Sequence, residues 1–180
     1  YSQKEINNLA RPTLMSGNAA FYFENPYVCI SIGGQDITRT YKSWSELIKK
    51  IDEDQELNSL SIFLMGSKNA IPDEIKILNQ SFKSIKIRSF VNKISIHQAR
   101  EIIAGSKLFI GTDGGLMHVA HSTTTPSVSL FSKDVNPEHR LTPLISSHPL
   151  VSKTNHVSDI PCHSIFIAMK SALEHCFKLK

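Results

Sequence analysis

The sequence is poor in the residues that build disulfide-linked or metal-stabilised folds. It contains three cysteines, Cys29, Cys162 and Cys176, an odd number without a CxxC spacing. Neither a disulfide framework nor a zinc site is therefore indicated, and a reducing compartment fits. No apolar run approaches the ~20 residues that a membrane-spanning helix needs, and no signal peptide is recognisable. We therefore expect a cytoplasmic protein.

A strong charge of either sign is also lacking, because the net charge is only +4 over 180 residues. The densest basic stretch, KSIKIR at 83–88, is interrupted by apolar residues at strand-like spacing. This weak, scattered balance suits an anionic ligand but does not indicate nucleic acid, which we do not expect as a partner. The signatures GxGxxG and GxxxxGK[ST] are missing, so ordinary dinucleotide binding and P-loop chemistry are not supported.

What the sequence does contain is a repeated alternation of strand-like and helix-like segments. Short apolar, β-rich runs predict strands at 27–32, 59–66, 84–90, 108–112 and 127–131. Helical spacing of apolar residues predicts helices over 43–51, 72–80, 95–105, 115–121 and 162–178. Ser43 and Ser95 are candidate N-caps, and Gly105 is a candidate helix stop.

This order predicts an α/β fold with a Rossmann-like, doubly wound parallel sheet. The strands are apolar on both faces, as a sheet covered by helices on both sides requires. We expect residues 1–26 to form a linker and residues 27–180 to form the domain. In such sheets ligands bind at the carboxyl ends of the strands. The loops that matter are therefore 33–42, 66–74, 90–95 and 112–118.

The stretch TDGGLMH combines a strand end, a carboxylate, two glycines and a histidine. Gly114 and Gly115 would let the backbone approach a ligand, and the start of a helix favours a phosphate. His118 lies about one turn into that helix and could face the same crevice. Alternatively, the glycines form only a tight turn, Asp113 caps the helix and His118 is a core histidine. A metal pair of His118 and His121 would need a third ligand, which the spacing does not supply.

A second stretch, DITRTYKSW at 36–44, follows the first strand and its Gly-Gly. It places Thr38, Arg39, Thr40 and Lys42 in a loop that leads into a helix. Hydroxyls and cations at a helix start are good phosphate ligands. The alternative is a solvated loop whose Trp44 packs under the helix.

Taken together, the two stretches resemble the C-terminal domain of the ADP-heptose–lipopolysaccharide heptosyltransferases, or family-nine glycosyltransferases. The resemblance extends from Tyr27 to Pro143, and its most specific parts are AREIIAGSKLFIGTDGGLMHVAH and TPSVSLF. The family commonly reads D-[ST]-G-x-x-H-x-A, which Asp113, Gly115, His118 and Ala120 match. The resemblance implies the C-terminal half of a two-domain GT-B glycosyltransferase.

The resemblance also implies roles for residues in the first two loops. Lys42 matches the lysine that contacts the diphosphate and sugar, and it would stabilise the departing diphosphate. Thr38 matches a diphosphate-contacting hydroxyl, and we add Thr40 from the same loop to the substrate-binding set. Glu74 best matches the acid that holds the ribose hydroxyls, with Asp73 as a rival.

For the later loops, Asp113 matches the acid that faces the donor sugar. Lys42 and Asp113 are therefore the two candidate catalytic residues. Gly114 and Gly115 match the backbone that approaches the donor, although the family has Ser or Thr at the position of Gly114. Ile94 lies where the family lines the adenine pocket. His118 matches the motif histidine.

The expected function is transfer of a sugar from a nucleoside diphosphate donor, ADP-heptose, to a lipopolysaccharide-core or related glycan acceptor. The resemblance implies an inverting reaction without cofactor or metal, at the cytoplasmic face of the inner membrane as a candidate location. The acceptor site and the catalytic base would belong to an N-terminal domain outside these 180 residues. One alternative is a non-catalytic domain that binds a nucleotide sugar. A sugar-nucleotide epimerase is less favoured, because its fuller set of acids and histidines is missing.

Overall fold

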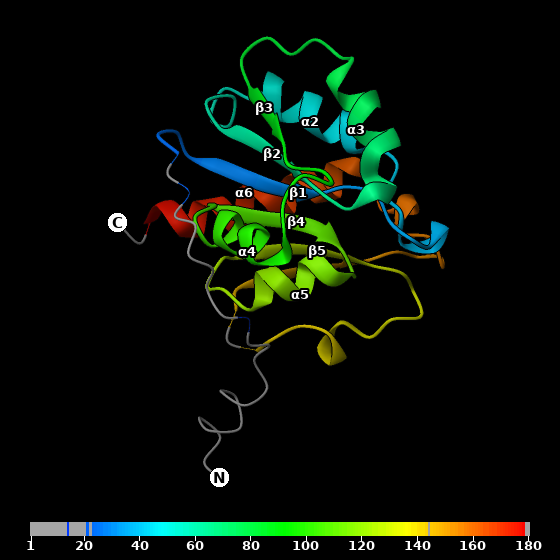
Figure 1. Ribbon diagram of the computed structural model, residues 1–180. Coiled ribbons are helices and arrows are strands. Elements are labelled where there is room, and N and C mark those ends of the chain that lie inside the picture. The colour runs from blue at the N-terminus through cyan, green and yellow to red at the C-terminus, as the bar shows by residue number, and fades with distance from the viewer. Residues whose placement is uncertain (1–13, 15–20, 22, 144, 179–180) are drawn as a thin grey trace.

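The computed structural model describes residues 14, 21, 23–143 and 145–178 (Figure 1). Most of the predicted linker, 1–26, thus lies outside the described residues. The described part contains a six-stranded sheet in the order β3-β2-β1-β4-β5-β6, and every neighbouring pair is parallel. This is the strand order of a Rossmann-like sheet, so the predicted fold class is confirmed.

The strands follow the predicted apolar runs with one addition. They are β1 (Tyr27–Ser31), β2 (Ser61–Met65), β3 (Lys86–Ser89), β4 (Leu108–Thr112), β5 (Ser127–Phe131) and β6 (Ser147–Val151). The sequence did not predict β6, whose five residues include His148 and Pro149. Its position at the edge of the sheet explains why a proline is tolerated, since one side of an edge strand makes no ladder hydrogen bonds.

The five α-helices of the described residues lie close to their predicted ranges. They are α2 (Trp44–Glu53), α3 (Ile71–Leu78), α4 (Ile96–Ala104), α5 (Gly115–His121) and α6 (Cys162–Lys178). Ser95 caps α4 in a capping box with Gln98, and Gly105 ends that helix, as predicted. Ser43 occupies the N-cap position of α2, but its side chain makes no capping hydrogen bond.

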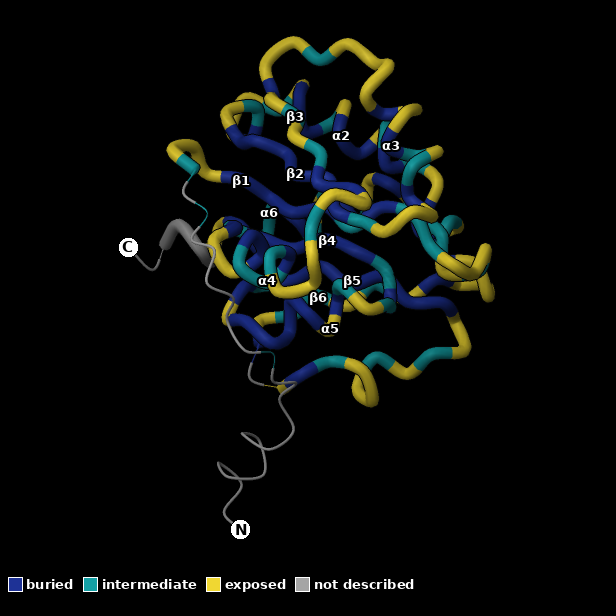
Figure 2. Tube along the Cα trace, in the orientation of Figure 1, coloured by how far each residue is buried: buried dark blue, intermediate teal, exposed yellow. Residues whose placement is uncertain are grey.

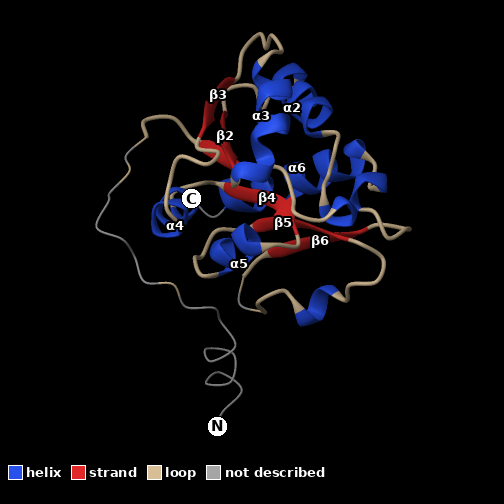
Figure 3. Cartoon of the chain, turned by 45° about the vertical axis from the view of Figure 1, so that its right-hand side comes forward, coloured by secondary structure: helices blue, strands red, loops and turns tan. Residues whose placement is uncertain are grey.

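The helices cover the sheet on both faces (Figures 1 and 3). Along β2, Ile62 and Leu64 join one core cluster, which contains buried residues of α2, α3 and α6. Phe63 and Met65 join the other cluster, which contains residues of α4 and α5. Figure 2 shows the central strands buried between these layers. Burial on both faces explains why the strands read as continuous apolar runs.

Aromatic residues that precede β1 extend the core on the α4 and α5 face. Phe23 packs against Phe63 with ring centroids 4.7 Å apart and against Tyr27 at 5.2 Å. Phe21 stacks on Phe23 at 6.1 Å, and Leu14 also packs on this cluster. The described residues of the predicted linker therefore contribute to the packed core.

The position of β1 in the sheet determines where a ligand can bind. β1 pairs with β2 on one side and with β4 on the other. Connections leave β1 and β4 in opposite directions, which opens a crevice at the carboxyl ends of these strands. Among the described residues, no helix is both long and apolar enough to cross a membrane.

Candidate functional site

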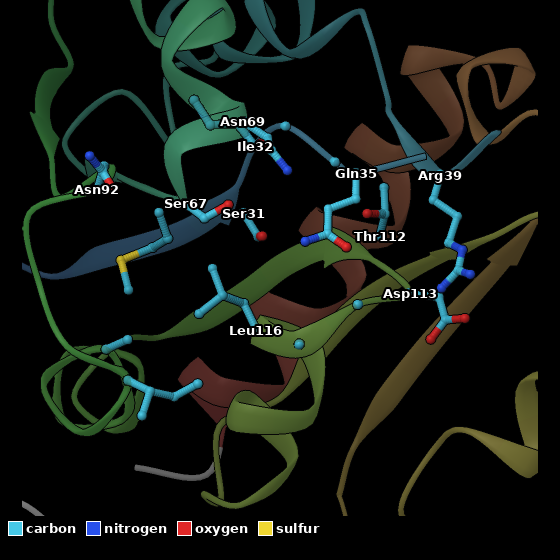
Figure 4. Close-up of a pocket in the computed structure, with 18 of the residues that line it drawn as sticks. Ser31, Ile32, Gln35, Arg39, Ser67, Asn69, Asn92, Thr112, Asp113 and Leu116 are labelled. Atoms are coloured by element: carbon cyan, nitrogen blue, oxygen red, sulfur yellow. The ribbon is translucent and has the colours of Figure 1, made fainter. Parts of the chain in front are cut away.

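A pocket of about 830 Å³ opens at this crevice (Figure 4). Residues from the loops that follow β1, β2, β3 and β4 all line it, as predicted from the topology. Its polar lining is mostly uncharged: Ser31, Gln35, Ser67, Asn69, Asn92, Ser95 and Thr112. Its charged residues are Asp36, Arg39 and Asp113, so Arg39 is the one cation in the described lining.

Two glycines of the pocket lining, Gly33 and Gly66, lie in close contact with Ala70. Gly33 has a φ of +76°, and a Cβ at this position would lie 2.5 Å from the Ala70 Cα. A Cβ on Gly66 would lie 2.5 Å from the Ala70 Cβ and 2.8 Å from the Ile32 carbonyl oxygen. Only glycine therefore fits at Gly33, where both the backbone conformation and the space exclude a side chain.

The predicted hydroxyl ligands of the first loop are engaged within that loop. The backbone N–H and the hydroxyl of Thr38 each donate to the Asp36 carboxylate at 2.8 Å. The Thr40 hydroxyl donates to the Asp36 carbonyl oxygen, also at 2.8 Å. The hydrogen bond from the Thr38 backbone is the largest cause of the lowered pKa of Asp36. These hydroxyls could donate a hydrogen bond to a phosphate only by giving up their present acceptors, because each hydroxyl has one proton to donate.

The two cations of this loop occupy different places. Arg39 lines the pocket, and Figure 4 shows its side chain directed toward Asp113. Lys42 is exposed and is not among the lining residues, and its backbone N–H donates to the Ser158 hydroxyl at 3.0 Å. The loop thus presents Arg39, rather than the predicted Lys42, to the pocket.

The predicted ribose ligand, Glu74, is buried and lies outside the pocket lining. Its carboxylate accepts hydrogen bonds from the Ser89 hydroxyl at 2.5 Å and from Lys93 Nζ at 3.0 Å. The hydrogen bond from Ser89 is the largest cause of the lowered pKa of Glu74. Glu74 does not line the pocket, and it links the start of α3 to the end of β3. Its rival Asp73 is half-buried, and burial raises the pKa of its carboxyl group.

The loop after β3 contributes Ile94, which lines the pocket. Asn92 precedes it with a φ of +54°, a conformation that asparagine tolerates better than most residues. The backbone N–H of Asn92 donates to the Gly66 carbonyl oxygen at 2.9 Å, which joins two loops of the pocket. Asn92 also lines the pocket, and a left-handed residue at such a place is typical of functional sites.

Asp113 lines the pocket although only 4% of its surface is exposed. Its Oδ2 atom is buried and has no hydrogen-bond partner among the described residues. Gly114, not Asp113, occupies the N-cap position of α5, so the interpretation of Asp113 as a helix cap is wrong. A Cβ on Gly115 would meet no atom within 4 Å, and one on Gly114 would meet only the Thr112 carbonyl oxygen at 3.8 Å. The protein itself therefore leaves open space beside these glycines.

The two histidines of α5 differ in burial. His118 is exposed and does not line the pocket, so it is not a core histidine. His121 is fully buried, and its Nδ1 accepts a hydrogen bond from the Thr142 backbone N–H at 3.2 Å. Its Nε2 lies 3.2 Å from the Ser127 hydroxyl. Burial lowers the pKa of His121 to about 4, which keeps the ring neutral near pH 7.

No cluster of three or more His, Cys, Asp or Glu side chains suited to a metal occurs among the described residues.

The six-stranded parallel sheet and its polar pocket define an α/β domain of the Rossmann-like class with a ligand site at the strand ends. The model of glycosyltransferase family 9 (heptosyltransferase) matches residues 2–171. The chain therefore belongs to this family.

Solved structures share the fold at low sequence identity. A family 9 glycosyl transferase from Veillonella parvula DSM 2008 is 14% identical with a TM-score of 0.73, over 84% of this chain and 46% of that one. E. coli ADP-heptose lps heptosyltransferase II is 21% identical with a TM-score of 0.68, over 86% and 48%. E. coli heptosyltransferase WaaC with ADP is 16% identical with a TM-score of 0.64, over 82% and 44%. The chain thus spans less than half of each neighbour. A search of curated protein sequences gave no match.

Of the predicted site residues, the structure brings Ile94, Asp113, Gly114 and Gly115 together in the pocket lining. Thr38, Thr40, Lys42, Glu74 and His118 lie outside that lining. Sequence reasoning identified Arg39 as part of a phosphate-type loop but gave it no role of its own. It missed the amides of Gln35, Asn69 and Asn92, for which the only signal was their position in loops that follow strands.

Proposed function

We propose that this chain supplies the donor-binding part of a glycosyltransferase that uses a nucleoside diphosphate sugar. The supporting observation is the convergence of four loops on one polar pocket that contains a single cation and a buried carboxylate. Membership of family 9 supports the reaction class. The E. coli neighbours crystallised with ADP or with ADP-2-deoxy-2-fluoro heptose support ADP-heptose as the donor. The acceptor would be a lipopolysaccharide-core or related glycan.

In this proposal the diphosphate binds beside the first loop. The donor carries negative charge there, and more develops on the leaving diphosphate as the glycosidic bond breaks. Arg39 would stabilise that charge with a planar, bidentate guanidinium group. Lys42 remains a candidate for the same role from outside the described lining, as the family resemblance implies. Thr38 and Thr40 would contribute after exchanging their present acceptors within the loop.

The sugar end of the donor would face Asp113. A carboxylate accepts hydrogen bonds from sugar hydroxyls, and the buried Asp113 carboxylate keeps acceptor capacity that no hydrogen bond among the described residues satisfies. The open space at Gly114 and Gly115 leaves room for a ligand next to this carboxylate. Ile94 would contribute apolar contact to the base, while Glu74 would reach the ribose only after exchanging its present hydrogen bonds with Ser89 and Lys93.

The acceptor hydroxyl, the catalytic base and the inverting displacement would need a second, N-terminal domain. We therefore expect donor binding without sugar transfer when these 180 residues are tested alone. Isothermal titration calorimetry with ADP, UDP and GDP tests the proposal, with binding of ADP as the expected result. Absence of binding to all three at millimolar concentration would contradict it.

The alternative is a non-catalytic domain that binds a nucleotide sugar. Its support is the small number of carboxylates in the described lining, Asp36 and Asp113, of which Asp36 already accepts two hydrogen bonds from Thr38. A donor-consumption assay separates the two functions when an acceptor and an N-terminal heptosyltransferase domain are supplied. Turnover above the rate without this chain favours the enzyme, and binding without turnover favours the alternative.

A further inference from the structure

A second arginine reaches Asp113 from outside the pocket lining. The Nε of Arg140 lies 3.8 Å from the Asp113 Oδ2, the same oxygen that lacks a hydrogen-bond partner. The Arg140 side chain is 48% exposed, whereas the Asp113 side chain is 4% exposed. The pair therefore joins a buried acid to a cation that remains in contact with water. A buried carboxylate without any such compensation is costly.

The connection between β5 and β6 holds Arg140 in this place. Pro137–His139 form a short 3-10 helix, capped by the Asn136 side chain, which accepts from the Glu138 backbone N–H at 3.0 Å. The backbone N–H of Arg140 closes the turn by donating to the Pro137 carbonyl oxygen at 2.9 Å. Arg140 thus extends from a hydrogen-bonded turn rather than from an unrestrained loop.

The other side of Arg140 is anchored to α5. Two residues further on, the backbone N–H of Thr142 donates to Nδ1 of the buried His121. Because this nitrogen accepts, the ring proton resides on Nε2, next to the Ser127 hydroxyl. His121 ends the helix that begins two residues after Asp113. Asp113 and Arg140 are thus linked twice, once directly through their ion pair and once through α5, His121 and Thr142.

We propose that Arg140 is a positioning residue that fixes the Asp113 carboxylate for the sugar of the donor. The proposal rests on the proposed function, since it assigns the Asp113 end of the pocket to the sugar. Arg140 keeps the charge of Asp113 compensated and directs Oδ2 toward the β5–β6 connection. The remaining acceptor capacity of the carboxylate is then left for sugar hydroxyls. Arg39, which lines the pocket, serves the diphosphate instead.

This division of roles predicts a selective effect. Loss of Arg140 should weaken binding of an ADP-sugar, because Asp113 no longer holds one orientation. It should leave ADP binding nearly unchanged, because ADP lacks the group that Asp113 recognises. A purely structural role of Arg140 would weaken both ligands together.

The experiment compares ADP with ADP-heptose by calorimetry on wild type, Arg140→Ala, Arg140→Gln and Arg140→Lys. We expect Arg140→Ala and Arg140→Gln to lower the affinity for ADP-heptose roughly tenfold, with ADP little changed. Tenfold is about the effect of losing one charge-assisted hydrogen bond between Asp113 and the sugar. Arg140→Lys should retain part of the affinity because it keeps the charge. Lys133→Ala is the matched control, since it removes a positive charge from the same exposed connection. It should behave as wild type with both ligands.

A double-mutant cycle with Asp113→Asn tests whether Arg140 acts through Asp113. In the Asp113→Asn background, Arg140→Gln should have no further effect on ADP-heptose. An unchanged preference for ADP-heptose over ADP in both Arg140→Ala and Arg140→Gln would overturn the inference, and so would a full effect in the Asp113→Asn background. Wild type that binds neither ligand would overturn the proposed function as well. Wild type that binds both while the Arg140 variants match it would overturn the inference alone.

Discussion

Gly33 lies directly against Ala70, so that a Cβ on Gly33 would come within 2.5 Å of the Ala70 Cα and 2.7 Å of its Cβ. The two residues belong to the loops that follow β1 and β2, and their contact brings these loops together at the pocket lining, to which Gly33 belongs. The neighbouring atom is backbone, so it cannot move aside at little cost. The φ of +76° at Gly33 adds strain to any replacement.

We therefore predict that Gly33→Ala lowers the free energy of unfolding by about 2 kcal/mol, from crowding and backbone strain combined. Urea denaturation measures this change. Gly115→Ala is the matched control, because no atom lies within 4 Å of the added Cβ. It should alter the stability by less than about 0.5 kcal/mol. Equal stability of the two variants would show that the close contact at Gly33 is relieved elsewhere.

A second prediction separates the two cations of the first loop. Arg39→Ala should weaken ADP binding by about 1.5–3 kcal/mol, the range for hydrogen bonds to charged groups. Lys42→Ala should weaken it less, because Lys42 lies outside the pocket lining. Binding of adenosine should be unchanged in both variants, since it lacks the diphosphate. Calorimetry with ADP and adenosine measures these affinities. A larger loss of ADP affinity in Lys42→Ala than in Arg39→Ala would show that Lys42, and not Arg39, is the main diphosphate contact.

Local patterns predicted most of the fold. Each central strand is an apolar run that is buried on both faces, and α4 carries its own cap and stop in Ser95 and Gly105. The strand β6 escaped prediction because its residues, SHPLV, have little strand character of their own. They become a strand through parallel pairing with β5, in which Pro149 faces Ser129. Such pairing depends on contacts that a local pattern does not contain.

The site was predicted less completely for the same reason. The sequence located the loops correctly, because the carboxyl ends of parallel strands meet at one edge. It could not show that the Glu74 carboxylate would accept hydrogen bonds from Ser89, at the end of β3, and from Lys93, in the turn that follows β3. Nor could it show which histidine of α5 is buried, because His121 accepts a hydrogen bond from Thr142, 21 residues further along the chain.

The buried His121 gives a prediction about pH. Burial lowers its pKa from 6.5 to about 4, so the unfolded chain binds this proton more readily than the folded protein does. Its contribution to stability should be complete above pH 6.5 and should decline as the pH falls toward 4. The slope for one such group is up to about 1.4 kcal/mol per pH unit.

His121→Asn should flatten this part of the pH profile, because asparagine offers an acceptor for Thr142 but does not titrate. Urea denaturation at several pH values between 4 and 7 measures the profile. The control is His163→Asn, which changes an exposed histidine on α6 and should leave the slope in place. Identical profiles for wild type and His121→Asn would mean that His121 is readily protonated in the folded protein.

The last prediction concerns Asp113, where charge and recognition should separate. Asp113→Asn preserves the size of the side chain and removes its charge. ADP binding should be unchanged or slightly stronger, because a negative charge near the diphosphate is lost. ADP-heptose should bind roughly tenfold more weakly, because an amide has one acceptor oxygen, which cannot serve both Arg140 and the sugar hydroxyls.

Stability should change by no more than about 1 kcal/mol in Asp113→Asn. The loss of the partly exposed pair with Arg140 is small, and the removal of a buried charge offsets it. Calorimetry with both ligands and a thermal melt measure these effects. Asp36→Asn, which alters the other carboxylate of the lining, is the control and should not change the preference for ADP-heptose over ADP. An equal loss for both ligands in Asp113→Asn would assign Asp113 to the shape of the pocket rather than to the sugar.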